Sequence, residues 1–133
     1  MTDLGHWETS AILTEDSYGF IYEIINLVSG RKYIGKKQMI SIKKMPPLKG
    51  KKNKRHKKIE TDWKDYCSSS NELQADINKL GKDKFKFIIL QFCNSKWELA
   101  YFETKLQFER QVLISEEYYN GIINCRIGKK PKL

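Results

Sequence analysis

The residue whose position points most clearly to a chemical role is Glu103, an acid on the apolar face of a predicted helix. Its helical neighbours three and four positions away are Leu99, Ala100, Leu106 and Gln107, so its own helix offers no basic partner. Burying an unpaired carboxylate costs on the order of several kcal/mol. A divalent cation would offset that cost, although an acid on the helix surface is the simpler interpretation. Glu103 is therefore a candidate metal ligand.

A second feature is a concentration of positive charge between residues 43 and 58, a segment without an acid. The chain has 25 basic and 16 acidic residues. Without the nine basic residues of this segment the two numbers are equal, so the net charge of +9 arises from this segment. Such a patch is typical of a surface that binds a polyanion, whereas a solvated loop or a targeting signal is the alternative. The nine residues are Lys43, Lys44, Lys49, Lys51, Lys52, Lys54, Arg55, Lys57 and Lys58.

The elements that must position these groups begin with a predicted antiparallel hairpin over residues 19–25 and 31–35, around a Ser29-Gly30 turn. A two-residue turn would place Tyr33 opposite Asn26 and Lys37 opposite Tyr22. Both tyrosines would then lie on one face of the hairpin.

The rest of the chain predicts a loop, two helices and a strand. Residues 38–59 lack sustained periodicity and contain Pro46-Pro47, so we expect a mobile basic loop. Ser69-x-x-Glu72 and Ser95-x-x-Glu98 are capping boxes that open helices ending near Gly81 and Leu113. A buried strand is expected over residues 84–92 between them.

The tyrosines carry a family resemblance. Phe20-Ile21-Tyr22 and, eleven positions on, Tyr33-Ile34-Gly35 resemble the paired signature of GIY-YIG nucleases, with Phe20 in place of its first glycine. The resemblance covers roughly residues 18–124. It implies an α+β (α/β) fold in one domain over residues 1–133, with a three-stranded antiparallel sheet flanked by helices. In style the chain is most similar to short phage-type, free-standing homing endonucleases, without an appended DNA-recognition domain.

The resemblance also implies roles for individual residues. Tyr22 would act as the base or position the attacking water, Tyr33 would orient it, and Glu103 would hold one Mg²⁺ or Mn²⁺ ion. A phenol with a pKa of about 10 is a poor base near neutrality, so a cation must help. Lys37, or with less support Lys36, could do so.

The remaining family positions match less directly. Arg55 is the best candidate for the arginine that clamps the scissile phosphate, and Arg31 is the second choice. Asn120 would hold the site together, with Asn124 as runner-up, and His56 could supply an auxiliary basic group. The residues expected to contact DNA are Lys36, Lys51, Lys52, Lys54, His56, Lys57 and Lys58.

These observations predict a metal-dependent endonuclease that hydrolyses double-stranded DNA, as a monomer or a DNA-induced dimer, in the cytoplasm of a host cell if phage-encoded. An inactive nucleic-acid-binding protein of the same fold is the alternative, followed by a basic RNA-associated protein. No run approaches the roughly 20 apolar residues of a membrane span. Three dispersed cysteines match neither a disulfide framework nor a zinc site.

Overall fold

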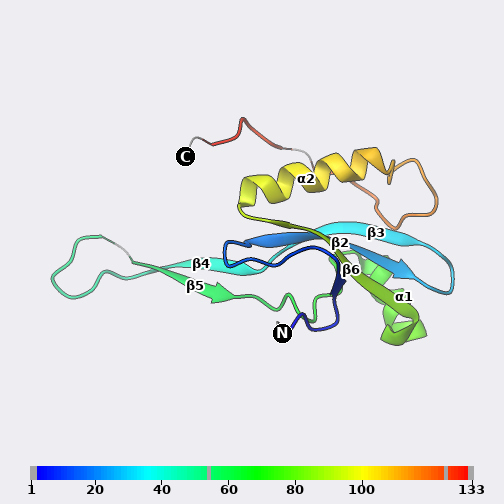
Figure 1. Cartoon of the computed structure of the whole chain (residues 1–133), viewed down its shortest axis with the longest axis horizontal. Helices are drawn as coiled ribbons and strands as arrows, with labels where there is room; N and C mark the ends of the chain where they lie inside the picture. The colour runs from blue at the N-terminus through cyan, green and yellow to red at the C-terminus, as the bar shows by residue number, and fades with distance from the viewer. Residues whose placement is uncertain (1–2, 54, 125, 132–133) are drawn as a thin grey trace.

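A computed structural model describes residues 3–53, 55–124 and 126–131. Its main sheet has the strand order β1-β6-β2-β3 (Figure 1), with β1 at Glu8–Thr9, β2 at Gly19–Asn26, β3 at Lys32–Gln38 and β6 at Phe85–Cys93. β6, β2 and β3 are antiparallel neighbours, as the family resemblance implies. The two-residue β1 adds a fourth strand, parallel to β6.

The turn between β2 and β3 differs from the predicted Ser29-Gly30 loop. Asn26 N–H donates to the Arg31 carbonyl over 2.8 Å, and Gly30 N–H donates to the Asn26 carbonyl over 2.7 Å, so residues 27–30 form the loop. The Asn26 side-chain oxygen closes it by accepting from the Val28 and Ser29 amides. Gly30 has a φ of +80°, a conformation that favours glycine.

This longer turn changes the register of the hairpin by two residues. Tyr33 pairs with Ile24 rather than Asn26, and Lys37 pairs with Phe20 rather than Tyr22, so both predicted partners are wrong. Side chains alternate between the faces of a strand, and a shift of two residues leaves every face assignment unchanged. The prediction that the two tyrosines share a face therefore holds.

Two helices cover the sheet. α1 spans Asn71–Leu80 and is capped by Ser70, one residue after the predicted cap, and it ends at Gly81 as predicted. A short 3₁₀ turn, η1 at Lys82–Lys84, leads into β6. α2 spans Lys96–Glu109, begins at the predicted Ser95 cap and ends before Leu113. Neither helix in the described part of the chain is long and apolar enough to cross a bilayer.

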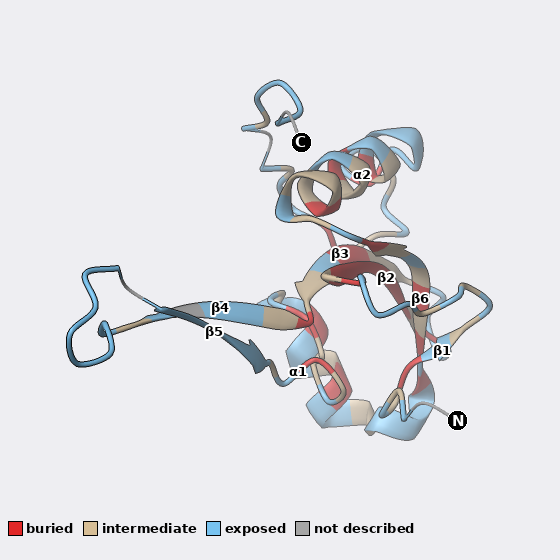
Figure 2. Cartoon of the chain, turned by 60° about the vertical axis from the view of Figure 1, so that its left-hand side comes forward, coloured by how far each residue is buried: buried red, intermediate tan, exposed pale blue. Residues whose placement is uncertain are grey.

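The buried residues form one core on each face of the sheet (Figure 2). The larger core, on the face of α1 and the N-terminal segment, contains Trp7, Phe20, Tyr22, Ile24 and Leu73. The smaller core, beneath α2, contains Ile21, Ile34, Cys93, Leu99 and Val112. β3 is an edge strand between these two layers, so side chains from both layers can meet along its outer edge.

The segment predicted to be an irregular loop is instead a β-hairpin. β4 at Ile40–Met45 and β5 at Arg55–Glu60 pair antiparallel in a separate two-stranded sheet that projects from the body (Figure 1). We call residues 40–60 the arm. The loop prediction is wrong for these two strands, because the many lysines obscure the alternation that Ile40, Ser41 and Ile42 begin. Of the described residues of the arm, residues 46–53 at its tip lie outside the two strands.

Candidate active site

Gly35 allows the two tyrosines to approach each other. Tyr22 lies opposite Gly35 in the β2–β3 pair, and its ring passes over the glycine. A Cβ atom at position 35 would lie 2.5 Å from Tyr22 Oη and 2.8 Å from a ring carbon of Tyr33. The Tyr22 ring centroid lies 6.0 Å from that of Tyr33 and 6.1 Å from that of Tyr66. A side chain at residue 35 would therefore disrupt a cluster of three phenols.

Tyr22 places an unsatisfied hydroxyl at this point. The residue is 0% exposed, and its Oη has no hydrogen-bond partner within the described part of the chain. Burial raises the pKa of Tyr22 well above its usual range, and the neighbouring Tyr33 adds to the effect. A buried, unpaired hydroxyl costs about 1–3 kcal/mol, so a functional reason for it is expected.

Glu103 reaches the same place from α2, across the edge of β3. Its side chain is only 14% exposed, and desolvation raises the pKa of the carboxyl group against the opposing effect of Lys36. Lys36 Nζ lies 3.9 Å from Glu103 Oε1 and is 45% exposed. The basic partner that the helix itself lacks thus comes from β3.

Two amide side chains hold the edge of β3 between the tyrosine and the lysine. Asn120 Oδ1 accepts from the Ile34 N–H over 3.1 Å, and Asn120 Nδ2 donates to the Ile34 carbonyl over 2.8 Å. Gln107 Nε2 donates to the same carbonyl over 3.0 Å. These hydrogen bonds pair the backbone N–H and carbonyl of Ile34, on the edge of β3 that no other strand covers in the described part of the chain. They fix the backbone that carries Tyr33, Gly35 and Lys36.

The groups converge on a cleft of about 320 Å³. Tyr22, Tyr33, Lys36 and Glu103 line it, and Lys36 is the only basic residue among the lining residues that the structure describes. Tyr66 and Ser69, from the segment before α1, close one side, and Tyr33 Oη lies 3.4 Å from Ser69 Oγ. The remaining lining residues are Gln107, Ile122 and Asn124.

Lys37, the predicted helper of the tyrosines, lies beside the cleft rather than in its lining. Its Nζ pairs with Asp62 Oδ1 at 2.7 Å and lies 4.1 Å from the centroid of the Tyr66 ring. Lys36 takes the position in the cleft instead. Lys37 lies on the same face of β3 as Tyr33, but Asp62 and the Tyr66 ring hold its ammonium group beside the cleft. Lys36 points to the opposite face, toward Glu103 on α2, and enters the cleft from that side.

The predicted arginines also lie outside the cleft. Arg55 is exposed on the arm, where its Nε donates to the Pro46 carbonyl over 3.2 Å. Arg31 pairs with Glu72 at 2.6 Å and lies over the Tyr119 ring at 4.1 Å. The structure therefore does not bring Arg55 together with the tyrosines and Glu103.

The predicted DNA-contacting residues other than Lys36 belong to the arm. Lys51, Lys52, His56, Lys57 and Lys58 are exposed there, and Lys54 lies outside the described residues. No motif or spacing predicts Tyr66, Ser69 and Gln107 in the cleft, because these residues reach it through packing between segments that are distant along the chain.

The comparison with known families identifies the domain. A family model described as "Putative endonuclease segE, GIY-YIG domain" matches residues 6–123. The chain therefore belongs to the GIY-YIG endonuclease family, which confirms the resemblance based on the tyrosine pair, and membership implies nuclease activity. No curated protein and no solved structure gives a significant match.

Proposed function

We propose that the cleft hydrolyses phosphodiester bonds in double-stranded DNA with the help of one Mg²⁺ or Mn²⁺ ion. The observation that carries the proposal is the convergence of three groups that this reaction needs: the buried carboxylate of Glu103, the cation of Lys36 and the free hydroxyl of Tyr22. Membership in an endonuclease family supports the reaction class. A phage-type, free-standing enzyme that acts in a host cell is the biological setting that we propose.

The chemistry of Glu103 fits a single hydrated ion. The carboxylate is largely buried, and its lysine neighbour is 3.9 Å away, so its charge is only partly compensated. Within the described residues, no group of three or more His, Cys, Asp or Glu side chains could hold a metal. Mg²⁺ keeps several waters and is often bound through one or two carboxylates. When bound, the ion would neutralise charge on the phosphoryl group and on the leaving oxygen.

The side chains of the cleft would contact the phosphate and position the attacking water. Lys36 is half-exposed and can contact a non-bridging phosphate oxygen, the role that the sequence suggested for Arg55. Tyr22 Oη can hold the attacking water, with Tyr33 orienting it. Because burial raises the pKa of Tyr22, the free protein holds a neutral phenol, and a positive charge entering the cleft would favour its ionisation.

One observation favours a second candidate, a DNA-binding protein of the same fold that has lost cleavage. None of the arginines in the described part of the chain lines the cleft. If a guanidinium is indispensable for cleavage, the chain would bind duplex DNA without cutting it.

Incubation of the purified protein with supercoiled plasmid, with Mg²⁺, with Mn²⁺ and with a chelator, separates the two candidates. The proposal expects nicked or linear DNA with either metal ion and intact plasmid with the chelator. Plasmid that stays supercoiled under all three conditions, although the protein binds a labelled duplex, would support the inactive binding protein instead.

A further inference from the structure

The arm is a feature that the active site does not explain. β4 and β5 pack chiefly against each other, and all six residues of β5 are exposed. Figures 1 and 2 show the arm extending away from both cores. An isolated two-stranded hairpin is marginally stable in water, so the arm adds little to the stability of the domain. A binding role would explain an ordered projection that contributes little to stability.

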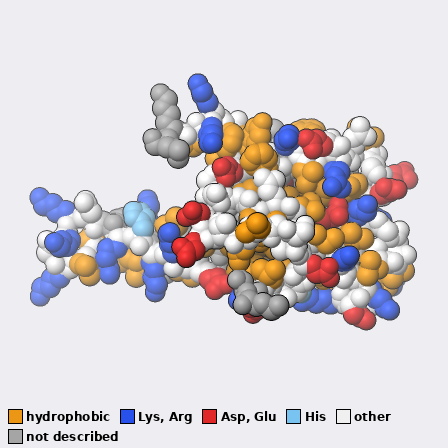
Figure 3. Space-filling view, in the orientation of Figure 1, with side chains coloured by type: hydrophobic (Ala, Val, Ile, Leu, Met, Phe, Trp, Pro, Cys, Tyr) orange, Lys and Arg blue, Asp and Glu red, His pale blue; other side chains and the backbone are white. Residues whose placement is uncertain are grey.

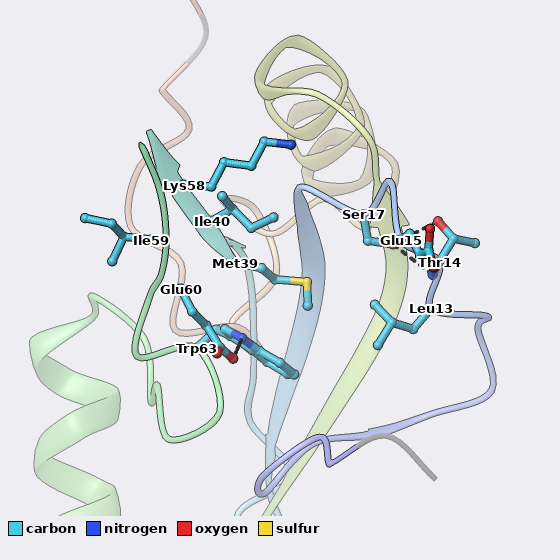
Figure 4. A pocket seen from close by; sticks show the side chains of 10 residues that line it. All are labelled: Leu13, Thr14, Glu15, Ser17, Met39, Ile40, Lys58, Ile59, Glu60 and Trp63. Carbon is cyan, nitrogen blue, oxygen red and sulfur yellow. Dashed lines mark hydrogen bonds between the residues drawn. The ribbon is translucent and has the colours of Figure 1, made fainter. Parts of the chain in front are cut away.

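Within the described part of the chain, hydrogen bonds attach the arm to the body at its root. Thr61 N–H donates to the Met39 carbonyl over 3.0 Å, and Thr61 Oγ1 donates to the Gln38 carbonyl over 2.6 Å. Trp63 Nε1 donates to Glu60 Oε1 over 2.9 Å. An apolar hollow of about 330 Å³ separates the root from the loop around Leu13 (Figure 4). The root therefore sets the direction of the arm, while its distal part contacts solvent.

Positive charge lies on both faces of the arm. Directly paired residues share a face, so Lys44, His56 and Lys58 lie on one face, and Arg55 and Lys57 lie on the other. No acidic residue occurs from residue 41 to residue 59. Figure 3 shows blue Lys and Arg side chains along the projecting arm. A ribbon lying across the outside of a duplex would need cations on one face only, whereas a groove has phosphates along both walls.

Apolar side chains lie between the charges on each face. Ile42 is 54% exposed on the first face, and Ile59 is 39% exposed on the second. Leu48, in the tip, is 52% exposed. Purely electrostatic tethering would not require these side chains, which are unfavourable in water. They suit a surface that also presents apolar groups, such as the thymine methyl groups in the major groove.

We propose that the arm inserts into the major groove of the DNA duplex next to the cleavage site. This inference rests on the proposed DNA substrate. Two strands lie about 4.8 Å apart, so the ribbon with its side chains needs a groove wider than the minor groove of about 6 Å. The major groove, about 12 Å wide, admits a two-stranded ribbon. The basic side chains of the two faces then contact phosphates on the two walls, and Ile42 and Ile59 lie beside them within the groove.

The connection to the active site sets the distance at which the arm acts. β3 carries Lys36 and continues into β4 after one intervening residue, so Ile40 and Met45 lie four and nine residues beyond Lys36. At about 3.3 Å per residue, these positions are up to about 13 Å and 30 Å from Lys36. With about 3.4 Å per base pair, the two strands of the arm contact DNA about 4–9 base pairs from the cut, on one side only.

The first test measures binding of a 30-base-pair duplex by fluorescence anisotropy. In one variant, residues 42–58 are replaced by Asn-Gly, which can close a two-residue turn between Ser41 and Ile59. A second variant changes Lys51, Lys52, Lys57 and Lys58 to Gln and leaves the backbone intact. The matched control also removes four positive charges, at lysines that are exposed outside the arm: Lys79→Gln, Lys84→Gln, Lys96→Gln and Lys105→Gln.

Loss of about four phosphate contacts should weaken binding by the arm-less protein on the order of 100-fold near 0.1 M salt. The slope of log affinity against log salt should change by about 0.9 per contact. The control should bind like the wild type. Methyl green, a major-groove ligand, should compete with the wild-type protein, and netropsin, a minor-groove ligand, should not. Equal binding by the arm-less protein, or competition by netropsin alone, would overturn the proposal.

The second test maps cleavage positions on end-labelled linear duplexes of mixed sequence. The wild type should leave uncut about 9 base pairs at the end that the arm must cover, and the arm-less protein should cut closer to that end. Identical cleavage maps would overturn the arm assignment but leave the nuclease function standing. A wild-type protein that binds no duplex at all would refute the proposed function as well.

Discussion

Replacement of Tyr22 by Phe removes one hydroxyl and keeps the ring in the core. Tyr22 Oη is buried and has no partner in the described part of the chain, so its removal should relieve a desolvation penalty of about 1–3 kcal/mol. Allowing for relaxation, we expect the free energy of unfolding to rise by about 1 kcal/mol, or Tm by about 3–5 °C. Cleavage should fall by about 10²- to 10⁴-fold if this hydroxyl positions the attacking water.

Urea denaturation and plasmid cleavage under identical conditions measure both effects. Tyr119→Phe is the matched control, because Tyr119 Oη donates to Asp76 Oδ2 over 2.7 Å and accepts from Asn26 Nδ2 over 2.9 Å. That variant should lose about 1–3 kcal/mol of stability and keep the cleavage rate per folded molecule. If Tyr22→Phe is destabilised and its activity loss matches its unfolded fraction, Tyr22 is a structural residue and the reasoning fails.

Three further predictions follow from the cleft and the arm. Lys36→Gln should slow cleavage at saturating DNA, while Arg55→Gln should mainly weaken binding, and single-turnover kinetics would distinguish the two effects. The reverse pattern would indicate that Arg55, not Lys36, contacts the scissile phosphate. Because desolvation raises the pKa of Glu103, its ionisation opposes folding as the pH rises. Glu103→Gln should therefore raise the metal-free urea midpoint at pH 7, with a smaller gain at pH 4, and an equal or lower midpoint at pH 7 would contradict this. Gly35→Ala should cost about 1–3 kcal/mol and impair cleavage, because its Cβ would overlap Tyr22 Oη; wild-type stability and rate would exclude that contact.

Local sequence signals predicted the elements that carry the site. The Ser95 cap and the apolar spacing around Glu103 located α2, because capping and helical periodicity depend on residues within a few positions of each other. The shared face of Tyr22 and Tyr33 was also predictable despite the wrong turn. The register error was even, and even shifts preserve the face of every side chain.

The parts that depend on distant contacts were not predictable from the residues alone. The order of residues along the chain favours Arg55, yet the arm carries this residue away from the cleft, and Lys36 lies in the cleft instead. Tyr66 and Ser69 reach the cleft through packing of the segment before α1, for which no periodic pattern exists. The β4–β5 hairpin of the arm was not predictable either, because lysine has a low strand propensity and interrupts the alternation of apolar residues.

The most direct test of the central claim is plasmid cleavage by Glu103→Gln in the presence of Mg²⁺. Glu109→Gln is the matched control, because Glu109 lies on the same helix, is exposed and pairs with Lys105 away from the cleft. We predict that Glu103→Gln folds and binds duplex DNA like the wild type but does not nick the plasmid, while Glu109→Gln cleaves normally. Cleavage by folded Glu103→Gln at the wild-type rate would contradict the assignment of this cleft as the active site.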